Sequence, residues 1–206
     1  MHDDQHGTAI IVLAGLLNAL RVAKKDLGRV KIVISGAGAA GIAVAKLLKL
    51  AGAKQLLLTD RQGIIVAGRK GLNSAKTELA RMTNPDREKG DLADALRGAD
   101  VFIGVSGPNI ATETMIRAMN KRAIVFALAN PIPEIMPDAA KRAGALVIAT
   151  GRSDFSNQLN NSQVFPGVFR GALDHRVRAI TDTMKLRAAR AIAALVPHPT
   201  PTSIVP

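Results

Sequence analysis

The sequence feature that most constrains the fold is a glycine-rich turn between a predicted strand and a predicted helix. Residues 30–35 (VKIVIS) form a short apolar run rich in β-branched side chains, which is typical of a buried strand. The turn GAGAAG occupies positions 36–41, and helix-forming residues with apolar side chains at three-to-four spacing follow it. A strand, a tight turn and a helix in this order predict the start of a βαβ unit and therefore a parallel sheet.

The three glycines of this turn have the spacing G-x-G-x-x-G, and each has a different expected role. Gly36 allows the tight turn, Gly38 lets the backbone approach a pyrophosphate, and Gly41 lets the helix pack closely on the sheet. The helix that begins with Ala39 and Ala40 offers free N–H groups and the positive end of its dipole to phosphates. Because the motif follows a strand and opens a helix, it predicts dinucleotide binding.

An acidic residue follows at the position where dinucleotide-binding folds place a ribose contact. Asp60 ends the second predicted strand, about 20 residues after the turn. Its carboxylate is a suitable acceptor for the hydroxyls of the adenosine ribose, which favours NAD. Arg61 comes next and offers a cation to the 2′-phosphate of NADP, with Arg69 and Lys70 further along. We therefore expect NAD or NADP as cofactor, with Asp60 favouring the first and Arg61 the second.

The rest of the chain alternates between short apolar runs and helical patterns. Further strands are predicted at 55–59, 101–105, 124–128 and 146–149, and helices at 73–82, 92–96, 112–119 and 137–143. The stretch 171–195 is helical and basic, and a proline-rich end closes the chain as an extended segment. The predicted fold class is α/β: a Rossmann-type, doubly wound, mainly parallel sheet with helices on both faces.

A separate apolar stretch precedes the glycine-rich turn. Residues 8–20 (TAIIVLAGLLNAL) are shorter than a membrane span, and no positive region precedes them as in a signal peptide. We predict a buried helix in a soluble, cytoplasmic protein with no membrane partner. Residues 1–29 are assigned to this helix, packed on the next domain. Residues 30–206 are assigned to a dinucleotide-binding domain with a C-terminal helix and an extended tail.

Composition excludes several classes of site. The 206 residues include no Cys, no Trp and no Tyr, which excludes disulfides, zinc–thiolate centres and a tyrosine acid or base. With five Phe, the chain has few aromatic platforms on which single-stranded nucleic acid can stack. The net charge of +12 suits nucleic acid, but Lys and Arg are dispersed from Arg21 to Arg190. We therefore expect no nucleic-acid partner.

Two carboxylates, Asp3 and Asp4, precede the apolar helix in the sequence HDDQHGTA. One interpretation is structural, because acidic side chains are favourable at a helix N-terminus. A functional interpretation is that one carboxylate ligates a hard divalent cation, Mg²⁺ or Mn²⁺, through oxygen. Capture of a metal by His2 and His6 is a third interpretation. Composition leaves the first two open.

Four motifs together resemble those of bacterial malic enzymes. They are HDDQHGTAI, VISGAGAAGIAVAKLL, VFALANPIPEI and ATGRSDFSNQLNNSQVFPGVFRGALD, in that order along nearly the whole chain. The last block is specific to the family, whereas the glycine-rich turn is shared by many dehydrogenases. The resemblance implies the NAD(P)-binding domain of an enzyme that oxidises L-malate with NAD or NADP. It also implies that the product is decarboxylated to pyruvate and CO₂, with Mg²⁺ or Mn²⁺.

The same resemblance implies roles for individual residues. Asp4 corresponds to a metal ligand, and Asp3 to its neighbour, which supports the metal site and its proton network and is the catalytic candidate. Asn130 in ALANP corresponds to an asparagine that holds substrate beside the nicotinamide of the cofactor. Asn160 and Asn161 correspond to a pair that faces substrate and cofactor. The loop at 106–109 departs from the family, which usually has glycine at its last position, so its backbone is expected to differ.

Missing residues limit the expected activity. In the family, a general-base lysine, a tyrosine that protonates the enol and a Glu-Asp pair of metal ligands lie upstream of HDDQHGTA, where this sequence begins. We therefore expect a chain that binds NAD(P), turns over malate feebly without an N-terminal catalytic domain, and forms a homo-oligomer. A non-catalytic dinucleotide-binding regulatory module is the alternative. A basic nucleic-acid-binding protein on a similar fold is less favoured.

Overall fold

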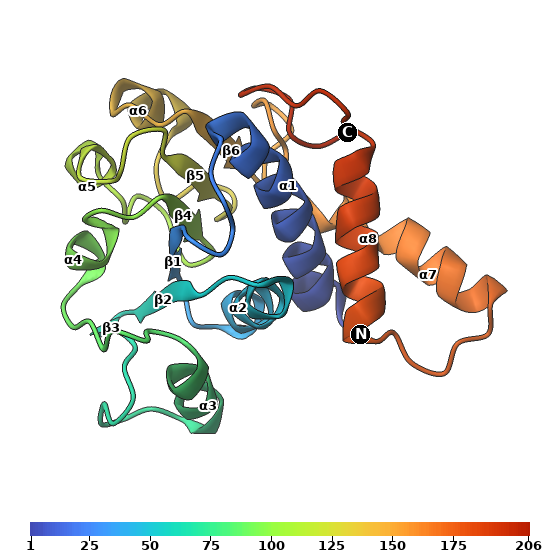
Figure 1. The fold of residues 1–206 in the computed structure, drawn as a ribbon, viewed down its shortest axis with the longest axis horizontal. Helices are drawn as coiled ribbons and strands as arrows, with labels where there is room; N and C mark the ends of the chain where they lie inside the picture. The colour runs from blue at the N-terminus through green and yellow to red at the C-terminus, as the bar shows by residue number, and fades with distance from the viewer.

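Six strands form one mainly parallel sheet in the computed structural model, which describes all 206 residues (Figure 1). The order along the sheet is β3-β2-β1-β4-β5-β6, and only β3 runs antiparallel to its neighbour. The strands are β1 (Lys31–Ser35), β2 (Gln55–Asp60), β3 (Gly63–Ile64), β4 (Val101–Gly104), β5 (Ile124–Ala127) and β6 (Val147–Thr150). The predicted α/β, Rossmann-type fold class is confirmed.

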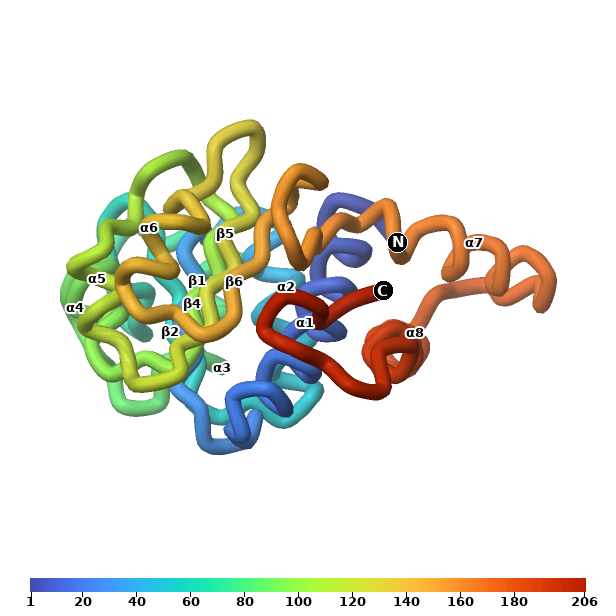
Figure 2. The backbone as a smooth tube through the Cα atoms, turned by 90° about the horizontal axis from the view of Figure 1, so that it is seen from above, coloured from blue at the N-terminus to red at the C-terminus, as the bar shows by residue number.

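Helices cover both faces of this sheet. They are α1 (Thr8–Ala23), α2 (Ala39–Ala51), α3 (Ser74–Met82), α4 (Leu92–Leu96), α5 (Glu113–Arg117), α6 (Pro137–Arg142), α7 (Phe165–Asp174) and α8 (Asp182–Ala194). Helices α1, α2 and α8 lie on one side of the sheet, and α4, α5 and α6 on the other (Figure 1). Helix α7 extends away from this body, as Figures 1 and 2 both show.

Strand side chains alternate between two apolar clusters, one on each face. Ile32 and Ile34 belong to the cluster of 36 buried residues under α1, α2 and α8, whereas Val33 belongs to the cluster of 16 under α4, α5 and α6. The same alternation continues in β4, where Phe102 faces the smaller cluster. Because consecutive strand residues point to opposite faces, a run that is apolar at every position is buried on both. This explains why the strands have continuous apolar sequences.

Helix α1 lies in the middle of the larger cluster, against α2 and α8. A π-helical turn, η1 (Asp3–Gly7), precedes it. The combined helix Asp3–Ala23 is long and apolar enough to cross a membrane, but 72% of its most apolar window is buried inside the protein. Its apolar surface is thus covered by the fold, which confirms the buried helix. Since α1 shares one cluster with β1, the division at residue 29 stays a prediction.

In the structure, the predicted helical stretch 171–195 contains parts of two helices, the end of α7 and the whole of α8. Helix α7 begins at Phe165, with Pro166 in its first turn, and α8 begins after Thr181, whose hydroxyl caps it by accepting the N–H of Met184. Proline at the first helical positions and threonine at a cap are start signals, so both beginnings were available to pattern analysis. The two-residue strand β3 was also missed, because it is too short to show a period.

The proline-rich end also differs from the extended tail that was predicted. Thr200 and Ser203 pair across a turn, and Ile204 and Val205 are buried. Asn18 on α1 holds this segment, because its amide donates to the carbonyl oxygens of Ala193 (2.8 Å) and Ile204 (2.9 Å). A buried amide therefore joins the first helix, the last helix and the end of the chain.

Asn18→Ala is expected to lower the free energy of unfolding by about 2 kcal/mol, because two buried hydrogen bonds to the carbonyl oxygens of Ala193 and Ile204 are lost. Asn120→Ala is a matched control: its amide also donates two hydrogen bonds, to Gly98 and Asp100, but at an exposed position. Urea unfolding of both variants measures the difference. Equal losses would show that burial of the Asn18 bonds contributes nothing.

Candidate dinucleotide-binding site

The glycine-rich turn lies where the order of the strands reverses. From β1 the chain continues to β2 on one side, and β4 occupies the other side. At the carboxyl ends of β1 and β4, the hydroxyl oxygens of Ser35 and Ser106 are 3.3 Å apart. In open parallel sheets, ligands bind in the crevice outside the carboxyl ends of the strands at such a switch point. The fold therefore places residues 36–41 at the start of that crevice.

Each glycine of the turn meets a different steric demand. Gly36 has a φ of 113°, and a Cβ there would lie 2.6 Å from the carbonyl oxygen of Val105. A Cβ at Gly41 would overlap the carbonyl oxygen of Gly36, so only glycine lets α2 sit this close to the turn. A Cβ at Gly38 would meet nothing within 4 Å. The turn is thus tight at its two ends and open in the middle.

The N-terminus of α2 faces this open space. Gly38 caps the helix with no side-chain hydrogen bond, which leaves the N–H groups of Ala39 and Ala40 without an intrahelical partner. Free N–H groups and a helix dipole are the features that bind phosphate. The residues present therefore fit the pyrophosphate of a dinucleotide.

Asp60, the predicted ribose acceptor, is already bound by two cations. Its Oδ2 accepts hydrogen bonds from Arg69 (2.5 Å) and Lys76 (2.6 Å), and its Oδ1 accepts the N–H of Gln62 (3.0 Å). Burial raises the pKa of Asp60, but these hydrogen bonds outweigh it and lower the pKa to about 2. Arg61 beside it is exposed. Asp60 is therefore an ionised carboxylate in a fixed orientation, surrounded by positive charge.

Asp60 is expected to make the fold sensitive to strong acid. Folding lowers its pKa from 3.8 to about 2, so its stabilisation is present above pH 3.8 and is lost as the pH falls toward 2. A shift of this size corresponds to about 2 kcal/mol. Urea unfolding of the wild type and of Asp60→Asn measures the effect, with Asp86→Asn, an exposed carboxyl outside any ion pair, as control. A stability difference for Asp60→Asn that stays constant between neutral pH and pH 2 would contradict this assignment.

The loop after β5 carries Asn130 over the end of β6. A Cβ at Gly151, directly after β6, would lie 2.8 Å from the Asn130 amide nitrogen, so glycine leaves the space that this amide occupies. Arg152 fixes the same loop by donating to the carbonyl oxygen of Pro131 (2.7 Å). Asn130 thus lies at the carboxyl edge of the sheet, on the other side of the switch point from Asp60.

A buried carboxylate that pattern analysis missed lies under this loop. Glu134 has no exposed surface, and its two oxygens accept the N–H groups of Ser106 (2.8 Å) and Ala129 (3.0 Å). Burial raises the pKa of Glu134, and the backbone donors oppose this rise. The available signal was a glutamate within the apolar segment PIPEI. A charged residue is rarely buried unless it is paired, so a glutamate in this context indicated a carboxylate with specific partners.

Asp3 and Asn161 are in contact, although 158 positions separate them. The Asn161 amide donates to Asp3 Oδ2 (2.5 Å), and Asp3 Oδ1 is buried without a hydrogen-bond partner. Gly7 leaves room for this pair, because a Cβ there would overlap Asp3 Oδ1. Asn160 has a different position, since its side chain caps the next turn by accepting the N–H of Ser162 (2.9 Å). The structure therefore brings Asp3 to one asparagine of the predicted pair.

Asp4, the predicted metal ligand, points into solvent with 83% of its side chain exposed. Its carboxylate is 4.0 Å from the imidazole of His2, and no three His, Asp or Glu side chains of this chain converge on one point. A hard divalent cation takes about six oxygen ligands. The residues of this chain alone do not form a complete metal site, so Asp4 stays a predicted ligand.

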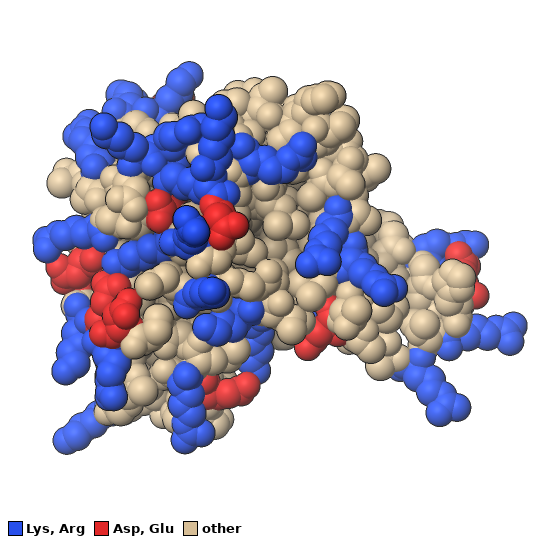
Figure 3. All heavy atoms as spheres, viewed as in Figure 1, with Lys and Arg blue, Asp and Glu red and all other residues tan.

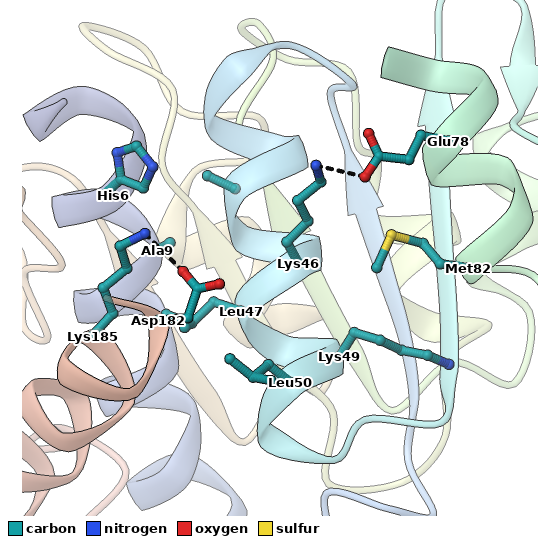
Figure 4. A pocket seen from close by; sticks show the side chains of 11 residues that line it. His6, Ala9, Lys46, Leu47, Lys49, Leu50, Glu78, Met82, Asp182 and Lys185 are labelled. Carbon is teal, nitrogen blue, oxygen red and sulfur yellow. Dashed lines mark hydrogen bonds and ion pairs between the residues drawn. The ribbon is translucent and has the colours of Figure 1, made fainter. Parts of the chain in front are cut away.

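A cavity of about 550 Å³ lies apart from these residues, between the start of α1 and helices α2, α3 and α8 (Figure 4). Two of its lysines are paired: Lys46 with Glu78, and Lys185 with Asp182, each at 2.8 Å. The pKa of His6 is lowered there, mainly by burial. Because carboxylates neutralise most of its cations, this cavity offers little net charge to a ligand.

Comparison with known proteins identifies the family. Residues 5–206 match the family model described as malic enzyme, NAD binding domain. The chain belongs to this malic enzyme family. It is similar to the bifunctional malic/malolactic enzyme of Bacillus subtilis, with 53% identity over 196 residues, which cover 95% of this chain and 48% of that protein. It is also similar to the NADP-dependent malic enzyme of Halomonas elongata, with 49% identity over 99% of this chain and 48% of that protein.

A solved structure agrees with the malic enzyme fold. The crystal structure of the NAD-dependent malic enzyme from Thermotoga maritima matches the whole chain with a TM-score of 0.97 and 47% identity, over 55% of its own length. The chain thus spans about half the length of the malic enzymes that it matches. The predicted resemblance is confirmed. These relatives include an NAD-dependent and an NADP-dependent enzyme.

Proposed function

We propose that this chain is the dinucleotide-binding part of an enzyme that oxidises L-malate with NAD or NADP and forms pyruvate and CO₂. The observation that carries the proposal is the arrangement along the carboxyl edge of the sheet. The open turn at 36–41 lies at the switch point, Asp60 lies on one side, and Asn130 on the other. This order matches the adenosine, pyrophosphate and nicotinamide parts of a dinucleotide.

The proposed roles follow from the donors and acceptors of these residues. The N–H groups of Ala39 and Ala40, above the open face of Gly38, hold the pyrophosphate, and Asp60 accepts the ribose hydroxyls. When bound, the nicotinamide accepts the hydride that leaves C2 of malate. The neutral amide of Asn130 orients the substrate beside it and adds no charge to the site.

The residues near the beginning of the chain have a supporting part in this proposal. The Asn161 amide fixes Asp3, whose buried Oδ1 has no hydrogen-bond partner within this chain and is proposed to support the metal site. Asn160 faces substrate and cofactor from the next turn. The exposed carboxylate of Asp4 contributes one ligand to Mg²⁺ or Mn²⁺, and the remaining ligands come from outside this chain.

Calorimetric titration with NAD⁺ and with NADP⁺ tests the cofactor proposal. We expect one of the two to bind at least tenfold more tightly than the other. Malate-dependent formation of NADH or NADPH by the purified chain is expected to be weak or absent, and to rise when a malic enzyme catalytic domain is supplied. Equal and millimolar-weak binding of both dinucleotides would contradict the proposed function. Robust turnover by the chain alone would contradict the need for a catalytic partner domain.

Arg61→Glu is expected to shift cofactor preference away from NADP⁺ by at least tenfold, because it places a carboxylate where a 2′-phosphate would contact the guanidinium. Arg81→Glu makes the same change of charge at an exposed position on α3 and serves as the control. The ratio of the NAD⁺ and NADP⁺ dissociation constants is the measurement. An unchanged ratio in Arg61→Glu would show that Arg61 does not contact the 2′-phosphate.

We also propose a cytoplasmic homo-oligomer without a nucleic-acid partner. The apolar side chains of Phe165, Leu173 and Val177, on and after α7, are exposed, which favours contact with a further domain or copy. Figure 3 shows Lys and Arg spread over the visible face with Asp and Glu among them, rather than gathered over one element. Such dispersal supports a soluble surface rather than a nucleic-acid footprint.

A further inference from the structure

The buried carboxylate of Glu134 joins two loops at the carboxyl edge of the sheet. The first loop follows β4 and contains Ser106, and the second follows β5 and contains Ala129 and Asn130. Each carboxylate oxygen accepts one N–H: Oε1 accepts that of Ser106 (2.8 Å), and Oε2 accepts that of Ala129 (3.0 Å). Both donors are backbone groups, so the carboxylate fixes the path of the chain directly.

Backbone hydrogen bonds continue the same connection. The N–H of Asn109 donates to the carbonyl oxygen of Pro133 (3.1 Å), and that of Ala111 to the carbonyl oxygen of Glu134 (3.0 Å). The last residue of β4, Gly104, leaves the space for the glutamate, because a Cβ there would overlap the Glu134 side chain. The sheet is therefore built to admit this carboxylate beneath the two loops.

The burial and the position of Glu134 indicate that its contacts with the two loops do more than fill space in the core. Glu134 has no exposed surface and no cationic partner. Burial of its charge therefore costs free energy, because the carboxylate loses its hydration. An apolar side chain would fill the same volume without this cost, but it would leave the two N–H groups unpaired. Ala129 immediately precedes Asn130, whose amide lies against Gly151 at the far side of the crevice. The carboxylate thus controls the loop that carries Asn130.

We propose that Glu134 is a positioning residue that holds the loops after β4 and β5 in the geometry required by the nicotinamide half of the cofactor. This inference rests on the proposed function. Across a switch point, the adenosine half lies over the β2 side, where Asp60 is, and the other half lies over β4 and β5. Loss of the carboxylate therefore affects one half of the dinucleotide and not the other.

The test compares two ligands, NADH and ADP-ribose, which lacks the nicotinamide. For Glu134→Gln, which keeps the volume but turns one acceptor into a donor, we expect NADH affinity to fall about tenfold while ADP-ribose affinity stays within twofold. Glu134→Met, which removes both acceptors, is expected to lose at least as much. Asp100→Asn is the matched control, because Asp100 accepts the N–H of Lys31 and the ammonium of Lys25 at the opposite edge of the sheet.

A parallel measurement keeps the inference testable where a variant does not fold. In the wild type, hydrogen exchange at the N–H groups of Ser106 and Ala129 is expected to slow on binding NADH and to stay unchanged on binding ADP-ribose. Equal losses of affinity for both ligands, or an unchanged ratio in Glu134→Gln, would overturn the positioning role alone. A wild type that binds neither NADH nor NADPH would overturn the proposed function and this inference together.

Discussion

Gly41→Ala is expected to abolish measurable dinucleotide binding and to lower the free energy of unfolding by about 2–3 kcal/mol. The reason is steric: the added Cβ overlaps the carbonyl oxygen of Gly36, which belongs to the rigid backbone of the turn. To relieve the overlap, α2 must move away from the end of β1. This movement displaces the N–H groups of Ala39 and Ala40, which are the proposed phosphate donors. Stability and binding therefore fail together.

Two further glycine variants separate these effects. Gly38→Ala meets no atom within 4 Å, so its stability should equal that of the wild type. The added methyl group occupies space proposed for the pyrophosphate, so the affinity for the dinucleotide should fall about tenfold or more. This is about the loss expected when one charge-assisted hydrogen bond cannot form. Gly171→Ala on α7 also meets no atom and should leave binding unchanged. Urea unfolding and calorimetry measure the two quantities, and wild-type affinity in Gly41→Ala would refute the phosphate site.

Phe102→Ala is expected to cost about 3–5 kcal/mol of stability, the range for truncating a fully buried aromatic side chain. Phe102 lies in β4 at the centre of the sheet with no exposed surface, and it belongs to the smaller apolar cluster of 16 residues. Such a loss is a large part of the total stability of a domain, which is about 5–15 kcal/mol. Phe102 is the only aromatic member of this cluster, so no other ring can move into the cavity.

The matched control for this variant is Phe165→Ala. Phe165 is 39% exposed on α7, where its ring packs on Phe169 at 4.3 Å between centroids. Its truncation should cost about 1 kcal/mol or less, the value of an exposed aromatic pair. Chemical unfolding monitored by circular dichroism compares the two variants. Similar losses for both would mean that the cluster under α4, α5 and α6 contributes little to stability.

The sheet and most helices were predictable because their signals are local. Apolar, β-branched runs of four to six residues marked the parallel strands, since such strands are buried on both faces. Helix starts followed their capping residues: Asn73, Asp91 and Thr112 each accept a backbone N–H from the first turn of the helix that they precede. The glycine-rich turn was predictable because its spacing is a local pattern, although the close contact at Gly36 comes from the distant Val105.

The parts of the site that were not predictable depend on contacts between distant segments. Pattern analysis proposed Asp60 as a ribose acceptor but did not predict its two cationic partners. Arg69 and Lys76 reach it only because β3 and α3 fold back beside β2. Pattern analysis gave Asp4 a role as metal ligand and Asp3 a supporting role, but it did not predict that Asn161 contacts Asp3. For Glu134 the only local signal was its place in the apolar segment PIPEI, which does not say which N–H groups it binds. Side-chain pairs of this kind are set by tertiary packing, which sequence spacing does not encode.

The burial of α1 has a consequence for the order in which the chain folds. Asn18 on α1 reaches its partner at Ala193, 175 positions later, so α1 is covered by a helix that is synthesised well after it. Until α8 arrives, a helix of this hydropathy presents its apolar side to solvent, which invites aggregation. Strands β4, β5 and β6 pair in sequence order, so this part of the sheet needs no segment beyond Thr150. During synthesis, the side of α1 that α8 covers therefore stays exposed until α8 has formed.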